Sequence, residues 1–402
     1  MERKTMHRTI VDIHVLQNVP PSNMNRDDTG TPKSAFYGGV RRARVSSQAW
    51  KRATREQFGR LLPPEQLGVR TKKVVEALAE RITEHDGSLA DNALKLAEVT
   101  LSAATGSALD VPKRKAKDDA DGAAAAESKY LMFLSRRQLD ALAELAVDVS
   151  AGGDGETLKK SLKEKEHKSR ARNAVNTRHS IDIALFGRMV ADSTDLNVDA
   201  ATQVAHALSV HRSDIESDYY TAVDDRNEES EAGAGMIGMV DFNSSTLYRY
   251  AAVDVDQLQR NLGVGLRDDE PPNTPTAKAV IAFLEAFITS LPAGKINTFA
   301  HNTLPSAVLV TLRKRWPLSF VGAFEEPVPK SEQGGFLRGS CRKLAEHARE
   351  TQRQYGLQED PTWVFRVGEE TRDLADCGTD VTFTQLLESV EESVAGRLES
   401  RV

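Results

Sequence analysis

The stretch NRDDTGTPKSAFYGGVRRARVSSQAWKRATREQFGR (residues 25–60) carries the most distinctive charge pattern of the sequence. From residue 26 onward it holds nine basic residues against three acidic ones, in a chain whose formal net charge is −6. So local a reversal of charge is a candidate anion-binding surface. Gly38 and Gly39 would let the backbone pass close to a bulky ligand, and the following arginines suit phosphate oxygens. The alternative is a solvated loop followed by an ordinary basic helix.

The whole chain has the composition of a soluble globular protein. Its 402 residues predict two lobes, or one core with large insertions, and 40% apolar with 28% charged residues is ordinary for this class. No apolar run is long enough to span a membrane, and no secretory signal is recognisable, which predicts a cytoplasmic protein with no membrane partner. Cys341 and Cys377 lie far apart and indicate neither a disulfide framework nor a zinc knuckle.

Hydrophobic periodicity predicts the strands and helices of the first half of the chain. Residues 10–19 alternate as a strand that Pro20 and Pro21 would end. Ser46 or Ser47 is the expected N-cap of a helix reaching about residue 58, on which Lys51 and Arg55 share a face. Residues 67–180 read as a mainly helical insertion, with a flexible low-complexity segment at about 106–130 and a basic run at 159–178.

The second half alternates between strands and helices. Strands are predicted at residues 181–190, 248–255 and 307–312, and helices at 197–211, 256–262 and from 274. Residues 211–241 form a long stretch with little periodicity, which in a compact core is usually functional or disordered. From residue 355 the chain is acidic, and this region is predicted to form peripheral helices. The pattern favours an α+β or split-βαβ sheet domain.

Three candidate catalytic or nucleotide-binding motifs fail on context. His14 stands alone on a strand without a second base or nucleophile, so a structural role is favoured. Asp27 and Asp28 could act as a metal ligand or general base, but their setting favours a turn braced by internal ion pairs. The glycine pattern at 233–238 lacks the strand-then-helix context of a dinucleotide site. No enzyme, cofactor or metal site is expected. The function that remains is binding of a nucleic-acid phosphate backbone by the basic residues of 25–60, a surface called the grip below.

Several long motifs resemble a known family. Residues 10–55, with IHVL, NRDD, YGG, RRARVSSQ and KRATR, resemble the opening of the CasC-type backbone subunit, a RAMP-superfamily protein of the type I-E CRISPR Cascade complex. The resemblance continues in IDIALFGRM (181–189), AHALSVH (205–211), DYYTAVDD (218–225) and LYRYAAVDVDQLQRNLG (247–263). Met24, the insertion at about 106–130 and the C-terminus depart from the family pattern.

The resemblance implies an α+β fold shaped like a hand. It places a modified RRM or ferredoxin-like palm in residues 1–66 and 181–402, with a peripheral acidic C-terminal region. Residues 67–180 would be the helical fingers inserted in the palm. The segment at about 211–241 would form a protruding β-hairpin thumb, whose acidic tip is expected to face solvent or a basic surface of a neighbouring copy.

The resemblance also implies residue roles. Positions expected to contact the guide RNA backbone are Arg26, Lys33, Arg41, Arg42, Arg44, Ser46, Gln48, Lys51, Arg52 and Arg55. Positions expected to pack around a displaced base are Met189, Tyr220 and Thr221. Charged side chains can grip phosphates without reading sequence, and aromatic or thioether groups can pack against an unstacked base.

The implied function is a non-catalytic backbone subunit of a CRISPR surveillance complex. Several copies would stack head to tail along one CRISPR guide RNA and present it to target DNA, together with the other Cascade subunits. Two alternatives remain open from the sequence: a RAMP-type endoribonuclease that would use His14 or the Asp27–Asp28 pair, and an RRM-like RNA-binding protein that works alone.

Overall fold

The computed structural model describes residues 8–106, 109–110, 126–150, 155–190, 193–222, 236–263, 273–333 and 335–400, which form two compact units. The sheet unit consists of Met1–Phe58, Gln203–Asp254 and Val280–Val402. The helical unit consists of Gly59–Thr202 and Val255–Ala279. The sequence-based division assigned residues 181–202 and 255–279 to the palm. Both segments lie in the helical unit, where the Asn261 side chain donates a hydrogen bond to the Ala184 carbonyl at 2.8 Å.

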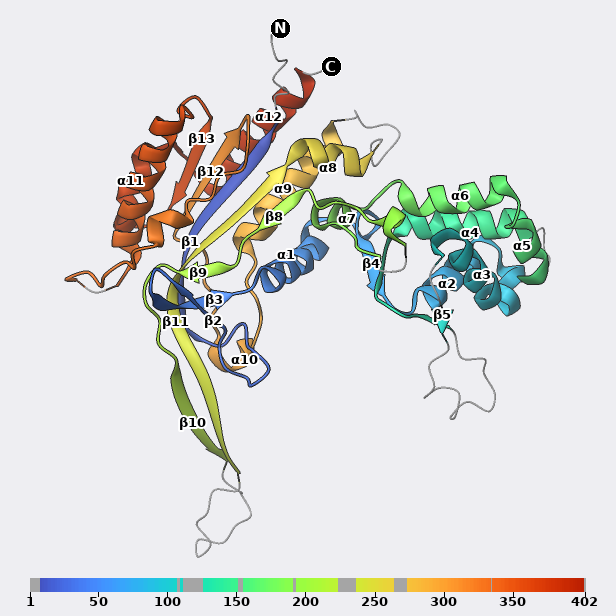
Figure 1. Cartoon of the computed structure of the whole chain (residues 1–402), viewed down its shortest axis with the longest axis horizontal. Coiled ribbons are helices and arrows are strands. Elements are labelled where there is room, and N and C mark those ends of the chain that lie inside the picture. The colour runs from blue at the N-terminus through green and yellow to red at the C-terminus, as the bar shows by residue number, and fades with distance from the viewer. Residues whose placement is uncertain are drawn as a thin grey trace, which may run out of the picture. The chain divides into compact units, whose positions relative to one another are not determined.

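A large, mainly antiparallel sheet forms the body of the sheet unit (Figure 1). Within the described residues its strand order is β14-β13-β12-β1-β11-β9-β3-β2, and β10 and β8 also pair with β11. The strands are β1 (Ile10–Ser22), β2 (Ser34–Tyr37), β3 (Val40–Val45), β8 (Thr202–Val204), β9 (Ala207–Ser209), β10 (Glu216–Ala222), β11 (Met236–Asp254), β12 (Ala307–Arg313), β13 (Thr362–Arg366) and β14 (Thr379–Asp380). With the helices below, this confirms the predicted α+β class.

β1 lies inside the sheet because its side chains are buried on both faces. Ile13, Val15 and Leu16 are fully buried, and the strand pairs with β11 on one side and with β12 on the other. The prediction that the prolines end this strand was wrong, since β1 continues to Ser22. A register irregularity after Val19 accommodates Pro20 and Pro21, which cannot donate hydrogen bonds to the ladder.

Helices pack against the sheet within the same unit. They are α1 (Ser47–Leu61), which begins here, α9 (Thr274–Thr289) from Val280 onward, α10 (Ile296–Phe299), α11 (Leu337–Tyr355), α12 (Phe383–Glu399) and the 3-10 segments η6 (Val321–Phe324) and η7 (Glu369–Cys377). α11 buries Leu344 in a cluster that includes Phe320 and Phe324. α12 starts with a Thr382–Gln385 capping box, and Arg397 in its last turn donates hydrogen bonds to the carbonyls of Leu312 and Arg313.

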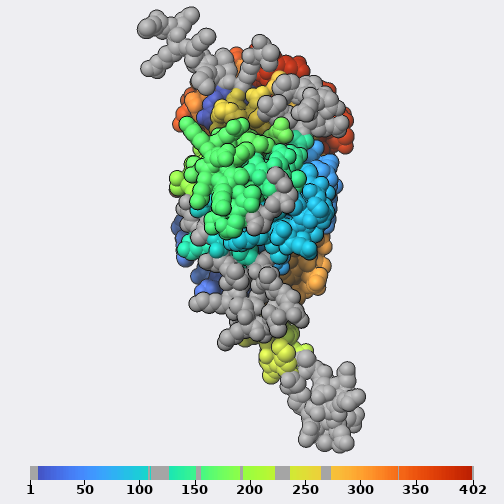
Figure 2. Space-filling model, turned by 90° about the vertical axis from the view of Figure 1, so that its right-hand side faces the viewer, coloured from blue at the N-terminus to red at the C-terminus, as the bar shows by residue number. Residues whose placement is uncertain are grey.

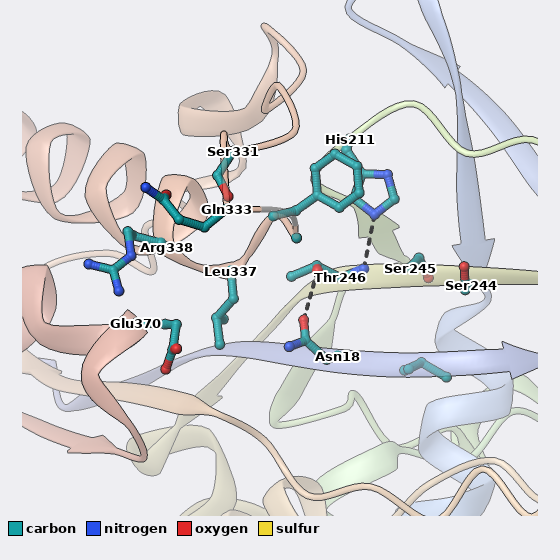
Figure 3. A pocket seen from close by; sticks show the side chains of 13 residues that line it. Asn18, His211, Ser244, Ser245, Thr246, Ser331, Gln333, Leu337, Arg338 and Glu370 are labelled. Atoms are coloured by element: carbon teal, nitrogen blue, oxygen red, sulfur yellow. Dashed lines mark hydrogen bonds between the residues drawn. The ribbon is translucent and has the colours of Figure 1, made fainter.

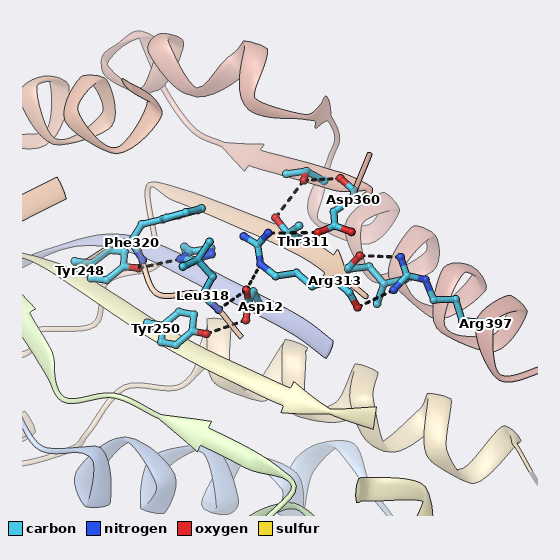
Figure 4. Close-up of polar contacts among 12 residues, drawn as sticks. Asp12, Tyr248, Tyr250, Thr311, Arg313, Leu318, Phe320, Asp360 and Arg397 are labelled. Atoms are coloured by element: carbon cyan, nitrogen blue, oxygen red, sulfur yellow. Dashed lines mark hydrogen bonds and ion pairs between the residues drawn. The ribbon is translucent and has the colours of Figure 1, made fainter. Parts of the chain in front are cut away.

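A buried ionic network joins β1 to the end of β12 (Figure 4). Asp12 accepts hydrogen bonds from Arg313, from the Tyr250 hydroxyl at 2.8 Å and from the Leu318 amide at 3.0 Å. Burial raises the pKa of Asp12 to about 6, although Arg313 lowers it. Between the ordinary pKa of 3.8 and the folded-state value of about 6, the folded chain binds more protons at this carboxyl than the unfolded chain, so stability falls as the pH rises through this window.

Helices dominate the second unit. They are α2 (Val74–His85), α3 (Ala93–Thr105), α4 (Arg136–Ser150), α5 (Gly155–Ser161), α6 (Lys165–Asn176), α7 (Ile181–Phe186), α8 (Val255–Leu262), the first residues of α9 (Thr274–Thr289), and the 3-10 segments η1 (Pro64–Gln66), η2 (Gly87–Asn92) and η4 (Thr194–Leu196). Short strand pairs accompany them: β4 (Gly68–Thr71) with β7 (Met132–Ser135), and β5 (Leu109–Asp110) with β6 (Glu127–Ser128). Leu78, Leu96 and Leu142 lie fully buried in their common core. Most of the segment predicted to be flexible lies outside the described residues.

Three predicted elements were wrong. Residues 181–190 contain the helix α7 instead of a strand, because a short apolar run does not distinguish the two by periodicity. Residues 197–211 contain β8 and β9 instead of a helix, because β11 offers pairing partners that override local propensity. The C-terminal region supplies β13 and β14 to the sheet, so it is not only peripheral helix.

Candidate nucleic-acid interface

The basic segment begins with a loop, residues 25–33, that a single carboxylate holds in shape. Asp27 Oδ1 accepts hydrogen bonds from the Thr29 amide at 3.0 Å, the Thr29 hydroxyl at 2.7 Å and the Thr31 amide at 3.1 Å. These bonds, led by that of the Thr29 hydroxyl, lower the pKa of Asp27. The prediction that Asp27 shapes a turn is therefore confirmed, although hydroxyl and amide groups brace it and not the ion pairs that were expected.

The loop closes against the start of α1. The Lys33 amide donates to the Asn25 carbonyl at 2.9 Å, and the Ser46 amide donates to Asn25 Oδ1 at 2.8 Å. The Arg44 amide in turn donates to the Lys33 carbonyl at 2.9 Å. The structure thereby brings together Lys33, Arg44 and the first turn of α1, three parts of the predicted grip. Arg26 lies exposed in the same loop.

The first turn of α1 is capped as predicted. Ser46 Oγ accepts a hydrogen bond from the Ala49 amide at 3.3 Å, and Ser46 itself is buried. Gln48 is exposed, whereas Lys51 and Arg55 are half-buried one and two turns further along. Burial lowers the pKa of Lys51. Because Ser46 is buried, its hydroxyl is not presented to solvent for the predicted contact with RNA.

Arg52 on α1 forms an ion pair with an acidic side chain one turn further along the helix. Its Nε donates to Glu56 Oε1 at 2.8 Å, and this bond raises the pKa of Arg52. Both side chains are exposed, so water screens the pair. Arg52 therefore offers a partly neutralised charge on the outer face of the helix.

A buried arginine anchors α1 from below. The Arg249 guanidinium lies 3.7 Å from the centre of the Trp50 ring and 4.6 Å from that of Phe287, and it donates to Gln17 Oε1 at 2.7 Å. Burial lowers the pKa of Arg249 to about 9. This stack fixes the inward face of α1, so the spacing between its outward polar groups is fixed as well.

Arg42 does not belong to the exposed surface, although it was predicted to contact RNA. Its side chain is fully buried and donates to the carbonyls of Tyr37 (3.1 Å), Ser209 (3.1 Å), Phe324 (2.8 Å) and Glu325 (3.0 Å). The neighbouring Arg41 is exposed, because successive residues of β3 point to opposite faces. Of these two adjacent arginines, Arg42 is therefore structural and Arg41 faces solvent.

Gly38 and Gly39 form the turn between β2 and β3, both with positive φ. A Cβ on Gly38 would lie 1.6 Å from the carbonyl oxygen of Glu325. The close approach that requires glycine is therefore to the protein's own backbone. The suggestion that these glycines make room for a ligand was wrong at Gly38.

The expected thumb region contains a long β-hairpin. β10 and β11 pair antiparallel from Glu216↔Phe242 to Ala222↔Met236, and the acidic tip predicted for this segment lies outside the described residues. Tyr220 and Thr221 are both exposed but, as consecutive strand residues, lie on opposite faces. The Tyr220 ring covers Gly238, where a Cβ would lie 2.5 Å from Tyr220 Cζ.

Apolar side chains on this hairpin remain exposed. Tyr219 is 65% exposed and lies directly opposite Met239, which is 69% exposed. Ile237 is 63% exposed on the same face. Thus the hairpin presents apolar surface on both faces, whereas the basic loop presents charge.

Asp241 joins the hairpin to the basic loop. One of its carboxylate oxygens accepts from the Thr31 hydroxyl at 2.8 Å, and the other accepts from the Ser217 hydroxyl at 2.7 Å. The Asn23 side chain adds a bridge, because its Nδ2 donates to the carbonyls of Gly30 at 2.9 Å and Asp241 at 2.8 Å. The predicted site included none of these residues, which carry no charge-pattern signal in the sequence.

Two features lie in the helical unit. Met189 is 82% exposed beside the bridge between Arg188 and Val198. The basic run at 159–178 falls on α5 and α6, seen in green beside α2 and α3 in Figure 2. Ala171 and Val175 are buried, and the run's charges include a 3.3 Å ion pair between Arg170 and Asp148. The run therefore lies mainly on α6, an amphipathic surface helix, and begins at the end of α5.

Two buried histidines could suggest acid–base chemistry, but both have structural partners. His14 is 1% exposed, contacts the Tyr248 hydroxyl at 2.9 Å and stacks on Phe320. His211 lines a cavity of about 540 Å³ (Figure 3), where its Nε2 accepts from the Thr246 amide at 3.1 Å. Its Nδ1 lies 2.6 Å from the Arg212 carbonyl and therefore carries the proton. Burial lowers the pKa of both histidines.

The described part of the chain holds no group of three or more His, Cys, Asp or Glu side chains placed to bind a metal ion. A membrane-crossing helix is likewise not found there, because none is both long and apolar enough.

The chain is similar to a chain of a solved "CRISPR RNA-guided surveillance complex, pre-nicking", with 33% identity and a TM-score of 0.78 over 96% of this chain and 100% of that one. A second chain, from a "CRISPR RNA-guided surveillance complex", shows 29% identity and a TM-score of 0.69 over 96% and 99%. A search of curated proteins found no match. The family model of CT1975-like proteins matches residues 11–390, and the chain therefore belongs to this family of Cas proteins.

Proposed function

We propose that this chain is a non-catalytic backbone subunit of a type I-E CRISPR surveillance complex, several copies of which assemble along one guide RNA. The observation that supports the proposal is the similarity to a chain of a CRISPR RNA-guided surveillance complex over 96% of the length, in a protein whose basic loop and α1 form one braced surface. The guide would then be presented for pairing with target DNA. Other Cascade subunits would complete the complex in the cytoplasm.

In this proposal the sheet unit acts as the RRM-like palm, the helical unit supplies the fingers, and the β10–β11 hairpin is the thumb. Arg26, Lys33, Arg41, Arg44, Gln48, Lys51 and Arg55 supply donors for the phosphate backbone. Most of these side chains are exposed or half-buried, and they carry no arrangement specific for a base edge. Such a surface accepts any guide sequence, as a shared scaffold must.

Exposed side chains outside the basic loop are proposed to contact the bases. Tyr220 and Thr221 on the hairpin are proposed to pack against a displaced base. Met189 in the helical unit is separately proposed to pack against a displaced base. Stacking on an aromatic ring tolerates any base, because each base offers a π-face. The opposite faces of Tyr220 and Thr221 mean that the hairpin would be contacted from two sides.

The absence of catalysis is part of the proposal. A ribonuclease would need an accessible base, but His14 is buried, and Asp27 Oδ1 already accepts three hydrogen bonds in its turn. Incubating the purified chain with labelled guide and target RNA, with and without Mg²⁺, tests this part. Cleavage that disappears in an Asp27→Ala variant would replace the scaffold proposal with the endoribonuclease alternative.

Sizing of the chain with and without guide RNA tests assembly. We expect a discrete complex of several copies per RNA, whereas a protein that binds alone would give single-copy complexes. If each copy neutralises ~5 phosphates, log affinity should fall with log salt at about −0.7 per phosphate, or roughly −3.5 per copy.

A further inference from the structure

His206 lies within the proposed grip, although the predicted RNA contacts did not include it. It follows β8 and precedes β9, and its ring is exposed beside the start of α1. The Ser47 amide donates to His206 Nδ1 at 3.2 Å, and Arg44 Nη1 lies 3.4 Å from the same nitrogen. The ring thus completes the cluster formed by Lys33, Arg44 and α1.

The two donors fix the tautomer of the ring. An amide and a guanidinium can only donate, so Nδ1 must be the unprotonated acceptor, and the proton of the neutral ring must be on Nε2. Among the described residues, none accepts a hydrogen bond from Nε2. The ring is therefore a rigid spacer with an N–H at its exposed end.

The surroundings keep this ring uncharged at neutral pH. Burial lowers the pKa of His206, and the charges of Arg44 and Lys33 lower it further. The same charges create a positive potential around the exposed N–H, which favours an anionic acceptor. Protonation of Nδ1 would also break the hydrogen bond that this nitrogen accepts from the Ser47 amide.

We propose that His206 donates a hydrogen bond from Nε2 to a phosphate oxygen of the RNA backbone, as an uncharged contact between the cationic side chains of the grip. The inference rests on the proposed function and adds a residue of a different chemical kind to it. Lys33 and Arg44 attract the phosphate over a distance, whereas His206 sets its position through one directed bond. Protonation of the ring plays no part in this contact.

Two substitutions separate this contact from a structural role. His206→Asn keeps an oxygen near the position of Nδ1 for the Ser47 amide but removes the outward donor. His206→Gln places its amide near the position of Nε2 and removes the inner acceptor. A residue that only braces α1 would tolerate Asn and not Gln, whereas a phosphate donor would show the reverse.

The measurement is fluorescence anisotropy with a labelled single-stranded RNA of mixed sequence, over a range of salt concentrations. We expect His206→Asn to bind roughly ten-fold more weakly and His206→Gln to bind within about two-fold of wild type, as expected for one hydrogen bond to a charged acceptor. The salt slope should stay unchanged in both, since no charge is removed, whereas Lys33→Ala should reduce it by about 0.7. Thermal unfolding of each variant checks folding.

Wild-type affinity in His206→Asn, or a weaker affinity confined to His206→Gln, would overturn the inference and leave a helix-bracing role. A wild-type chain that does not bind RNA would instead refute the proposed function itself. These outcomes are distinct because the wild-type measurement comes first.

Discussion

The basic loop with α1 and the β10–β11 hairpin offer RNA two different kinds of surface. In the loop, charged side chains stand on a backbone held by Asp27 and Asn25. On the hairpin, Tyr219, Met239 and their neighbours expose apolar area. Charge–phosphate contacts weaken with salt, whereas stacking is largely insensitive to it. Salt dependence can therefore assign a binding contribution to one region or the other.

The largest effect is expected from reversing two charges on α1. Lys51→Glu with Arg55→Glu should weaken RNA binding by about 4 kcal/mol and abolish multi-copy assembly, because phosphate attraction becomes repulsion. Anisotropy and sizing with guide RNA measure this, and the unfolding temperature should stay close to wild type. Arg353→Glu on α11, an exposed arginine paired with Glu350, is the matched control and should leave binding unchanged. Assembly at normal salt would contradict the role of α1.

Arg41 and Arg42 are neighbours on β3, but Arg41 is exposed and Arg42 is buried. Arg42→Ala leaves four carbonyls without their donor and should lower the free energy of unfolding by about 3 kcal/mol, measured by urea denaturation. Arg41→Ala should change stability by less than about 0.5 kcal/mol while reducing the salt slope of RNA binding. Equal stability losses would show that the two side chains share one environment.

The hairpin should contribute without changing the salt slope. Tyr220→Ser should weaken binding by about 1.5 kcal/mol through lost stacking. Tyr219→Ser on the opposite face, which also carries Thr221, is the comparison variant. Losses in both variants are expected if the hairpin is contacted from two sides, and a loss confined to Tyr220→Ser would show that only its face meets a base. A shallower salt slope in Tyr220→Ser would show instead that the change had disturbed the charged loop.

The smallest effect concerns the joint between the two regions. Thr31→Val and Asp241→Ala should each weaken RNA binding, and their combined loss should fall short of the sum by about 1 kcal/mol, since both break the same bond. Ser217→Ala, which loses the other bond of Asp241, should not show this coupling with Thr31→Val. Additive losses for the first pair would mean that loop and hairpin act independently.

Long periodic segments were predictable from the sequence. The helix on residues 47–61 and the strand from residue 10 followed from capping and alternation, and Asp27 from its turn chemistry. Short segments were not, because α7 and β9 owe their form to partners distant in sequence. His206 was hidden for the same reason, since it falls in a segment predicted to be helix.

Charge in the sequence did not reveal which basic residues are accessible. Arg42 and Arg41 are identical by composition, and only the carbonyls of Phe324 and Glu325, brought near by the fold, decide which one is buried. Arg52 was placed with the RNA contacts, yet Glu56 four residues later already pairs with it. Asp241 gave no sign of its role because its partners Thr31 and Ser217 lie far from it in the chain.

The turn of Asp27 has a consequence for the order of events in binding. Its three hydrogen bonds fix residues 27–31 during folding, so the entropy of ordering this loop is lost before any RNA arrives. A preordered loop spends less of its interaction free energy on arrangement and more on affinity. Changes at Thr29 should therefore act mainly on how fast RNA associates through a correctly shaped loop, while the contacts that hold it afterwards stay the same.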